Sequence, residues 1–195
     1  MYFNFHAWAG KMAGLLSLIS FVPYIVTTLQ GKNKPNRATW IIWGLVSIIL
    51  LASYKTVGAT HAIWPSVSNV VGMVLILILS FKYGVKEWSA LDTYCLIAAL
   101  VGLFFWWAFN SPLTALTMSI GIDLVGAIPT LKKSYLDPAS ENKLTWILFW
   151  SANTLNLFAV ESWNFAMAFY PLYLFFISGT IAVILIVRKK IYDSK

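Results

Sequence analysis

The composition of this 195-residue chain excludes a water-soluble globular fold. Apolar residues make up 59% of it, charged residues only 11%, and the mean hydropathy is +0.75, whereas a soluble domain carries about 25% charged residues. The charges that give the formal net charge of +7 lie at the ends of apolar runs, a pattern that indicates a membrane protein and excludes nucleic acid as a partner.

Seven apolar runs follow one another along the chain. They cover residues 8–30, 39–55, 62–82, 91–109, 112–131, 144–160 and 165–187. Crossing a hydrocarbon core of about 30 Å takes about 20 residues, and the shorter second and sixth runs favour a steep crossing or local thinning of the bilayer. We therefore expect an all-α, multi-pass membrane protein with seven transmembrane helices.

The first three predicted helices and the last three repeat each other's sequence. A shift of 106 positions superimposes, without a gap, Pro23 on Pro129, Asn36 on Asn142, Trp40 on Trp146 and Pro65 on Pro171. Because these residues keep their mutual spacing, we interpret the match as an internal duplication. The expected organisation is a three-helix repeat over residues 8–82, a linker helix within 83–111, and a second three-helix repeat over 112–190.

The basic residues predict the orientation of the helices. Every lysine and arginine except Lys11 and Lys55 lies in the loops after the first, third and fifth predicted helices or in the C-terminal tail. By the positive-inside rule the N-terminus is outside and the C-terminus is cytoplasmic. One linker helix separates the repeats, so they are expected to be parallel repeats about an axis along the membrane normal. The short tails favour a plasma (inner) membrane. Tryptophans near helix ends, Trp40 among them, are expected to form an interfacial belt.

Each repeat carries a proline inside its first predicted helix, Pro23 or Pro129, and another near the start of its third, Pro65 or Pro171. A proline within a helix frees a backbone carbonyl and kinks the axis. Matched breaks in two halves of a membrane protein point to a transport site and its hinges. We expect Pro23 and Pro129 to act as hinges or gates; Pro65 and Pro171 are either gates or helix starts.

These features resemble the SWEET and PQ-loop superfamily of small-solute carriers in its seven-helix, 3+1+3 form. The matching residues are Pro23, the basic segment 32–37 and Trp40 in the first repeat, and Pro129 and segment 143–146 in the second. The segment from Asn69 to Gly72 is similar to the Asn-x-x-Gly that SWEETs place at the substrate. The resemblance implies a carrier of sugars or similar solutes that works by alternating access, with proton coupling through an intramembrane aspartate.

Polar and aromatic side chains inside the predicted helices are the candidate solute contacts. Asn69 lies in the third helix, while the sixth carries Asn153 and Asn156, and Asn153 matches Ser47 under the repeat. Amides can hydrogen-bond a polar solute while aromatic rings stack on it, although such side chains also hydrogen-bond between membrane helices. We expect solute contacts from Asn69, Asn153, Asn156, Trp43, Ser47 and Trp150.

Asp123 is the only carboxylate well inside an apolar run. A charge at that depth is costly, so the residue is expected to face the interior, to pair or to be protonated. The matching residue of the first repeat is Ser17, so the fold does not need an acid there. This difference favours a role in proton coupling or in binding a cationic or hydroxyl-bearing solute; a structural hydrogen bond is the alternative.

The sequence therefore predicts a membrane carrier for a small polar solute, such as a sugar, an amino acid or a vitamin. The alternative is a non-transporting receptor of KDEL-receptor-like architecture. His6 and His61 have no partner at metal-ligand spacing, so we expect neither a metal, nor another cofactor, nor an enzyme. The expected partners are the solute and the lipid bilayer, and a homo-oligomer is left open.

Overall fold

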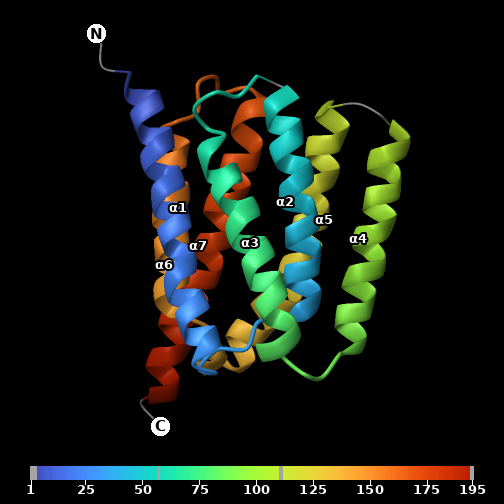
Figure 1. The fold of residues 1–195 in the computed structure, drawn as a ribbon, viewed down its shortest axis with the longest axis vertical. Coiled ribbons are helices and arrows are strands. Elements are labelled where there is room, and N and C mark those ends of the chain that lie inside the picture. The colour runs from blue at the N-terminus through green and yellow to red at the C-terminus, as the bar shows by residue number, and fades with distance from the viewer. Residues whose placement is uncertain (1–3, 57, 110–111, 194–195) are drawn as a thin grey trace.

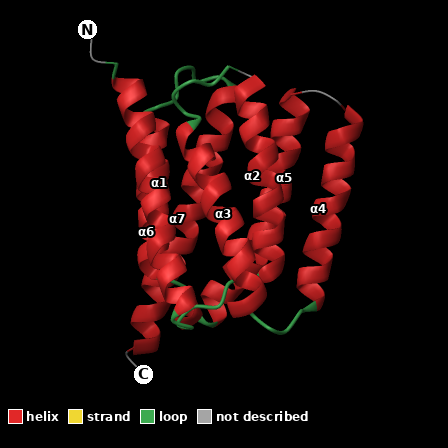
Figure 2. Ribbon diagram, in the orientation of Figure 1, coloured by secondary structure: helices red, strands yellow, loops and turns green. Residues whose placement is uncertain are grey.

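The computed structural model describes residues 4–56, 58–109 and 112–193, and within these ranges every regular element is helical (Figures 1 and 2). The elements are α1 (Phe5–Leu29), α2 (Arg37–Thr56), α3 (Trp64–Tyr83), α4 (Ala90–Phe109), α5 (Pro112–Leu136), the short 3-10 helix η1 (Pro138–Ser140), α6 (Lys143–Leu157) and α7 (Phe165–Asp193). Each of the seven predicted apolar runs coincides with one α-helix, so the helix prediction is confirmed.

Four of these helices, α1, α3, α4 and α7, are long and apolar enough to cross a membrane. In α2 the apolar stretch is shorter, Arg37–Ala52. Side chains that would be buried in a soluble protein face outward instead: Tyr94 and Trp107 on α4 are 69% and 71% exposed. Such a surface is typical of a helical membrane protein, in which lipid covers the apolar exterior.

Matched asparagines begin the second helix of each repeat. The side chain of Asn36 accepts a hydrogen bond from the backbone N–H of Thr39 (3.0 Å), and that of Asn142 accepts one from the N–H of Thr145 (2.9 Å). Each amide oxygen satisfies one of the backbone donors that the first turn of a helix leaves free. The same local device therefore sets the start of α2 and of α6.

The helices form a closed ring of six with α4 outside it (Figure 1). In the first triplet α3 lies between α1 and α2, and in the second α7 lies between α5 and α6. The ring closes where α1 packs on α6 and α2 packs on α5, while α4 packs mainly on α5. Successive helices of the chain run in opposite directions, so α1 and α5 run the same way and the two triplets have the same sense (Figure 1). The two contacts that close the ring are equivalent: the first helix of one triplet packs on the second helix of the other, as α1 does on α6 and α5 on α2.

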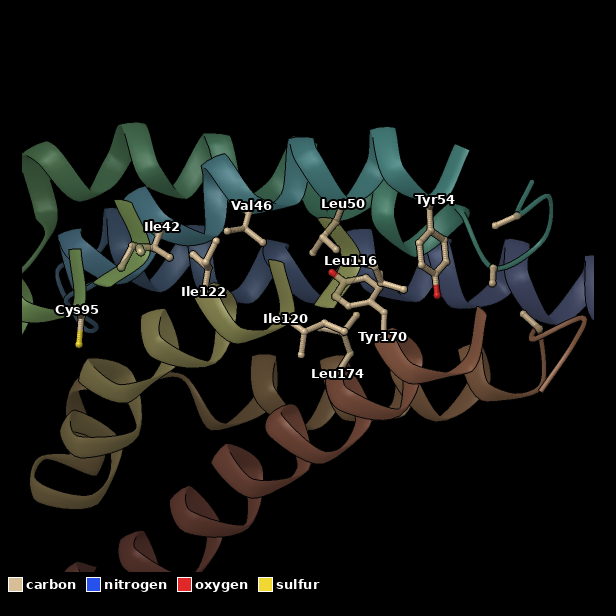
Figure 3. Packing of buried hydrophobic residues seen from close by; sticks show 14 of the residues in the cluster. Ile42, Val46, Leu50, Tyr54, Cys95, Leu116, Ile120, Ile122, Tyr170 and Leu174 are labelled. Carbon is tan, nitrogen blue, oxygen red and sulfur yellow. The ribbon is translucent and has the colours of Figure 1, made fainter. Parts of the chain in front are cut away.

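Two buried clusters pack the helices together: the first extends along α2 from Ile42 to Tyr54 and outward to Cys95 of α4, and the second lies within the ring. Figure 3 shows the first cluster, in which Leu50 and Tyr54 of α2 meet Leu116 of α5 and Tyr170 of α7. The second cluster lies nearer the end of the molecule that carries the lysine-rich segments 32–37, 82–86 and 132–143, which we call the basic end. It is rich in aromatic rings and includes the fully buried Trp40 and Tyr24. The expectation that Trp40 joins an interfacial belt is therefore wrong, because the ring encloses it.

A close approach of α1 and α3 depends on Gly72. A Cβ atom at this position would overlap the buried ring of Phe21, whereas a Cβ at Gly121 on α5 would meet nothing within 4 Å. We expect Gly72→Ala to destabilise the protein by about 1–3 kcal/mol through overpacking. Gly121→Ala is expected to be neutral or stabilising, since alanine favours the helix. Thermal unfolding in detergent measures both; equal melting temperatures for the two variants would contradict the packing argument.

Candidate functional site

A small cavity of about 40 Å³ lies inside the ring. All six ring helices contribute to its wall, which consists of Phe21, Trp40, Trp43, Asn69, Met73, Asp123, Trp146, Phe149, Asn153, Leu174, Ile177 and Ser178. The volume suffices for one or a few water molecules. Ligand pockets usually measure about 300–1,000 Å³, so a larger solute fits only if the helices around the cavity separate.

Each triplet presents one buried amide to this cavity, and a hydroxyl of the same triplet orients it. In the first triplet the hydroxyl of Ser17 on α1 donates to Oδ1 of Asn69 on α3 (3.0 Å). In the second, Nδ2 of Asn153 on α6 donates to Oγ of Ser178 (3.1 Å) and to the carbonyl of Leu174 (3.4 Å) on α7. Both asparagines are at least 90% buried. These contacts hold the amide groups in defined directions at the cavity wall.

Asp123 supplies the one carboxyl group among the described residues that line the cavity. It is 4% exposed, and its Oδ2 accepts a hydrogen bond from the hydroxyl of Tyr173 on α7. The indole N–H of Trp43 on α2 donates to the backbone carbonyl of Asp123 (3.0 Å). The acid is thus placed by one contact within its own triplet and one from the other triplet.

Three of the predicted solute contacts lie away from the cavity wall. Ser47 is buried, but its hydroxyl donates to the carbonyl of Gly44 in its own helix (2.9 Å). Asn156 is buried one turn beyond Asn153, and its Oδ1 has no hydrogen-bond partner among the described residues. Trp150 lines a separate apolar groove of about 310 Å³ between α6 and α7. The structure therefore brings together Asn69, Asn153, Trp43 and Asp123, but not these three residues.

The four prolines occupy different positions within their helices. Pro23 and Pro129 lie inside α1 and α5, as predicted, and Pro171 lies inside α7. Pro65 lies in the first turn of α3, where no i→i−4 hydrogen bond exists to be lost. Pro65 is therefore at a helix start, and its role as a gate stays a prediction. Pro171 is not at a helix start, because α7 already begins at Phe165.

Of the aromatic wall at the basic end of the cavity, only Trp43 was predicted from the sequence. The rings of Phe21 and Phe149 meet edge to face with centroids 4.7 Å apart, and Trp43 and Trp146 lie 6.0 Å apart. Both pairs join one triplet to the other. The available signal was the match of Trp40 with Trp146 under the repeat, since a pair of tryptophans at equivalent positions can face a common axis.

Glu141 closes the ring at the basic end. This side chain is 5% exposed and accepts hydrogen bonds from the hydroxyl of Tyr24 on α1 (3.3 Å) and from the indole of Trp146 (3.1 Å). It also forms an ion pair with Lys133, whose ammonium donates to the carbonyl of Lys34. A buried carboxylate is tolerated only when it is paired and hydrogen-bonded. These contacts therefore connect the two triplets.

Glu161 joins the triplets at the opposite end. It follows α6, and its Oε1 accepts hydrogen bonds from the N–H of His61 (2.6 Å), the hydroxyl of Thr60 (2.7 Å) and the N–H of Thr60 (3.3 Å). Deeper in, the hydroxyl of Tyr54 donates to the carbonyl of Met167 (2.9 Å). The cavity therefore lies between two sets of cross-triplet contacts.

Comparison with protein-family models, with curated proteins and with solved structures finds no match to this chain. The resemblance to the SWEET and PQ-loop superfamily stays a prediction that rests on the residues quoted above.

The contact between Glu161 and the segment of Thr60 and His61 predicts a pH-dependent stability. Partial burial raises the pKa of Glu161, but hydrogen bonds from Thr60 and His61 outweigh it and hold the pKa below its usual value. A lowered carboxyl pKa contributes stability above the unfolded pKa of about 4.3, and this stability is lost as the pH falls through the folded value. Glu161→Gln should therefore lower the melting temperature at pH 7 but not near pH 3.

The control for removal of one negative charge is Glu87→Gln, at an exposed side chain. A difference in melting temperature between wild type and Glu161→Gln that stays constant from pH 3 to pH 7 would contradict the assignment of this stability to the ionised carboxylate of Glu161.

Proposed function

We propose that this protein is a seven-span membrane carrier that moves a small polar solute by alternating access between its two helix triplets. The observation that carries the proposal is the central cavity: all six ring helices line it, and contacts between the triplets close it at both ends. In this proposal the N-terminus is outside, the basic end faces the cytoplasm, and the protein resides in a plasma (inner) membrane.

The two closures support a mechanism in which one end opens while the other holds. Opening the basic end requires Tyr24 to leave Glu141, and opening the opposite end requires Thr60 and His61 to leave Glu161. Neither step breaks hydrogen bonds inside a helix, so each triplet can move as a body. Pro23 and Pro129 lie within the first helix of each triplet and are the proposed hinges.

The chemistry of the cavity favours a small solute with hydroxyl or amino groups. Asn69 and Asn153 offer one oriented amide from each side, and Asp123 offers a carboxyl group. The rings of Trp43 and Phe149 provide apolar faces on which a sugar or an amino acid side chain can lie. We propose sugars, amino acids and vitamins as the classes to test.

Asp123 is the proposed proton site. Its carboxyl group lies in the cavity and accepts a hydrogen bond from Tyr173, so gaining a proton changes both the charge facing the solute and the contact between α5 and α7. Coupling follows if the protonated form favours one state of the carrier and the ionised form the other.

Counterflow into proteoliposomes, with panels of labelled sugars, amino acids and vitamins, tests the carrier. We expect saturable exchange of one class. Asn153→Ala should reduce it about tenfold or more, because a hydrogen bond to a buried polar group contributes about 1–3 kcal/mol. Asn156→Ala is the matched control, since it changes a buried asparagine of the same helix that does not line the cavity. Equal losses in both variants would contradict the site, and folded protein without exchange would favour the receptor alternative.

Proton coupling is tested by Asp123→Asn. This variant keeps the shape of the side chain and an acceptor for Tyr173 but cannot ionise. We expect counterflow to persist while accumulation driven by a pH gradient is lost. The measurement is uptake with and without an imposed pH gradient in the same proteoliposomes; accumulation retained by the variant would remove Asp123 from the coupling mechanism.

A further inference from the structure

A second and much larger cavity, of about 730 Å³, opens at the basic end of the molecule. It lies outside the aromatic wall, where the end of α3, the start of α4 and the end of α5 meet the loop between α1 and α2. Its volume falls within the range of about 300–1,000 Å³ that is usual for ligand pockets, unlike that of the central cavity. None of the solute contacts proposed above belongs to it.

Five lysines from three separate segments line this cavity. They are Lys34, Lys82, Lys86, Lys132 and Lys133. In the described part of the chain, ion pairs join His61 to Glu161 and Lys133 to Glu141. The ammonium groups of the other four lysines therefore have no carboxylate partner there, and all four side chains are exposed. Segments far apart in the sequence thus bring unpaired positive charge to one hollow.

Three carboxylates also line the cavity, and their positions decide what it can hold. Asp92 is 4% exposed and its oxygens are engaged by Nδ2 of Asn36 (2.8 Å) and by the N–H and hydroxyl of Ser89 (both 2.7 Å). It therefore serves the start of α4. Glu87 and Asp137 are exposed. The hydrogen bonds to Asp92 come from neutral donors and leave its charge in place, so the four lysines without an ion pair face three carboxylates, and the cavity keeps an excess of positive charge that favours an anion.

We propose that this cavity binds a phosphate group, either in the headgroup of an anionic lipid or in a free phosphate compound. Lysine is a common phosphate ligand that acts as a mobile point charge. Basic pockets between membrane helices on the cytoplasmic side bind anionic headgroups. Here the cavity opens beside α4, whose outer face carries the exposed Tyr94 and Ile97, so the acyl chains of a lipid would have an apolar surface next to the lysines.

A phosphate in this position would bridge the triplets. Lys82 lies in the last turn of α3 and Lys86 just beyond it, in the first triplet, whereas Lys132 lies near the end of α5 in the second. Pro129, the proposed hinge of α5, also lines the cavity. The occupied site would therefore restrain α5 at its basic end, although phosphate binding does not depend on the transport proposal.

The test uses the full chain in maltoside detergent and the double variant Lys82→Gln/Lys132→Gln. The matched control is Lys32→Gln/Lys143→Gln, which removes two exposed charges that do not line the cavity. Phosphatidylglycerol is titrated against phosphatidylcholine in one arm. In the other, inorganic phosphate is titrated against chloride at equal ionic strength. Bound lipid is counted by native mass spectrometry, and melting temperatures are recorded in both arms.

We expect wild type and control either to bind one phosphatidylglycerol or to be stabilised by inorganic phosphate. In the arm that responds, their apparent affinity for that ligand should be about tenfold or more above that of the double variant. A difference in the lipid arm assigns a headgroup, and a difference in the phosphate arm assigns a free phosphate compound. Equal behaviour of the double variant and the control in both arms, with both proteins folded, would overturn the proposal.

Discussion

The structure depends on one constraint: a polar interior enclosed by apolar helices must satisfy its own hydrogen bonds, because lipid offers none. The buried hydroxyls and amides meet this demand largely within a triplet, as Ser17 does with Asn69 and Asn153 with Ser178. Polar contacts between the triplets include the hydrogen bond from Trp43 to the carbonyl of Asp123 beside the cavity, and those of Glu141 and Glu161 lie at the two ends. The two cavity amides are therefore held from within their own triplets, while the contacts at the two ends are those that separating the triplets would break.

The two ends differ in how they resist opening. At the basic end the hydrogen bonds from Tyr24 to Glu141 and from Lys133 to the carbonyl of Lys34 are backed by aromatic rings that join the triplets, so separation would break these bonds and also expose apolar surface. At the other end Glu161 meets backbone N–H groups in a more exposed setting, where water can replace the protein donors. Opening the basic end should therefore cost more free energy than opening the other.

The helices could be predicted from the sequence because apolar runs of this length have few alternatives in lipid. Their ends were less certain: α5 continues to Leu136 and α7 to Asp193, past the predicted 131 and 187, since lysine-rich turns stay helical outside the hydrocarbon. Asn69 and Asp123 could be predicted from polarity alone. Tyr173 could not, because an aromatic residue in an apolar helix carries no sign of which face it occupies. Nor could the burial of Glu141, which depends on how α1 packs against α6.

Helix α4 contributes no residue, among those described, to the central cavity, and it packs on the outside of the ring. Without it, two identical triplets could close the same ring as a homodimer, but every position would then occur twice. The covalent connection lifts that restriction: Asn69 stands opposite Phe175, and Asp123 opposite Ser17. A single carboxyl group in the cavity requires non-equivalent halves, and the connection through α4 lets one chain supply them.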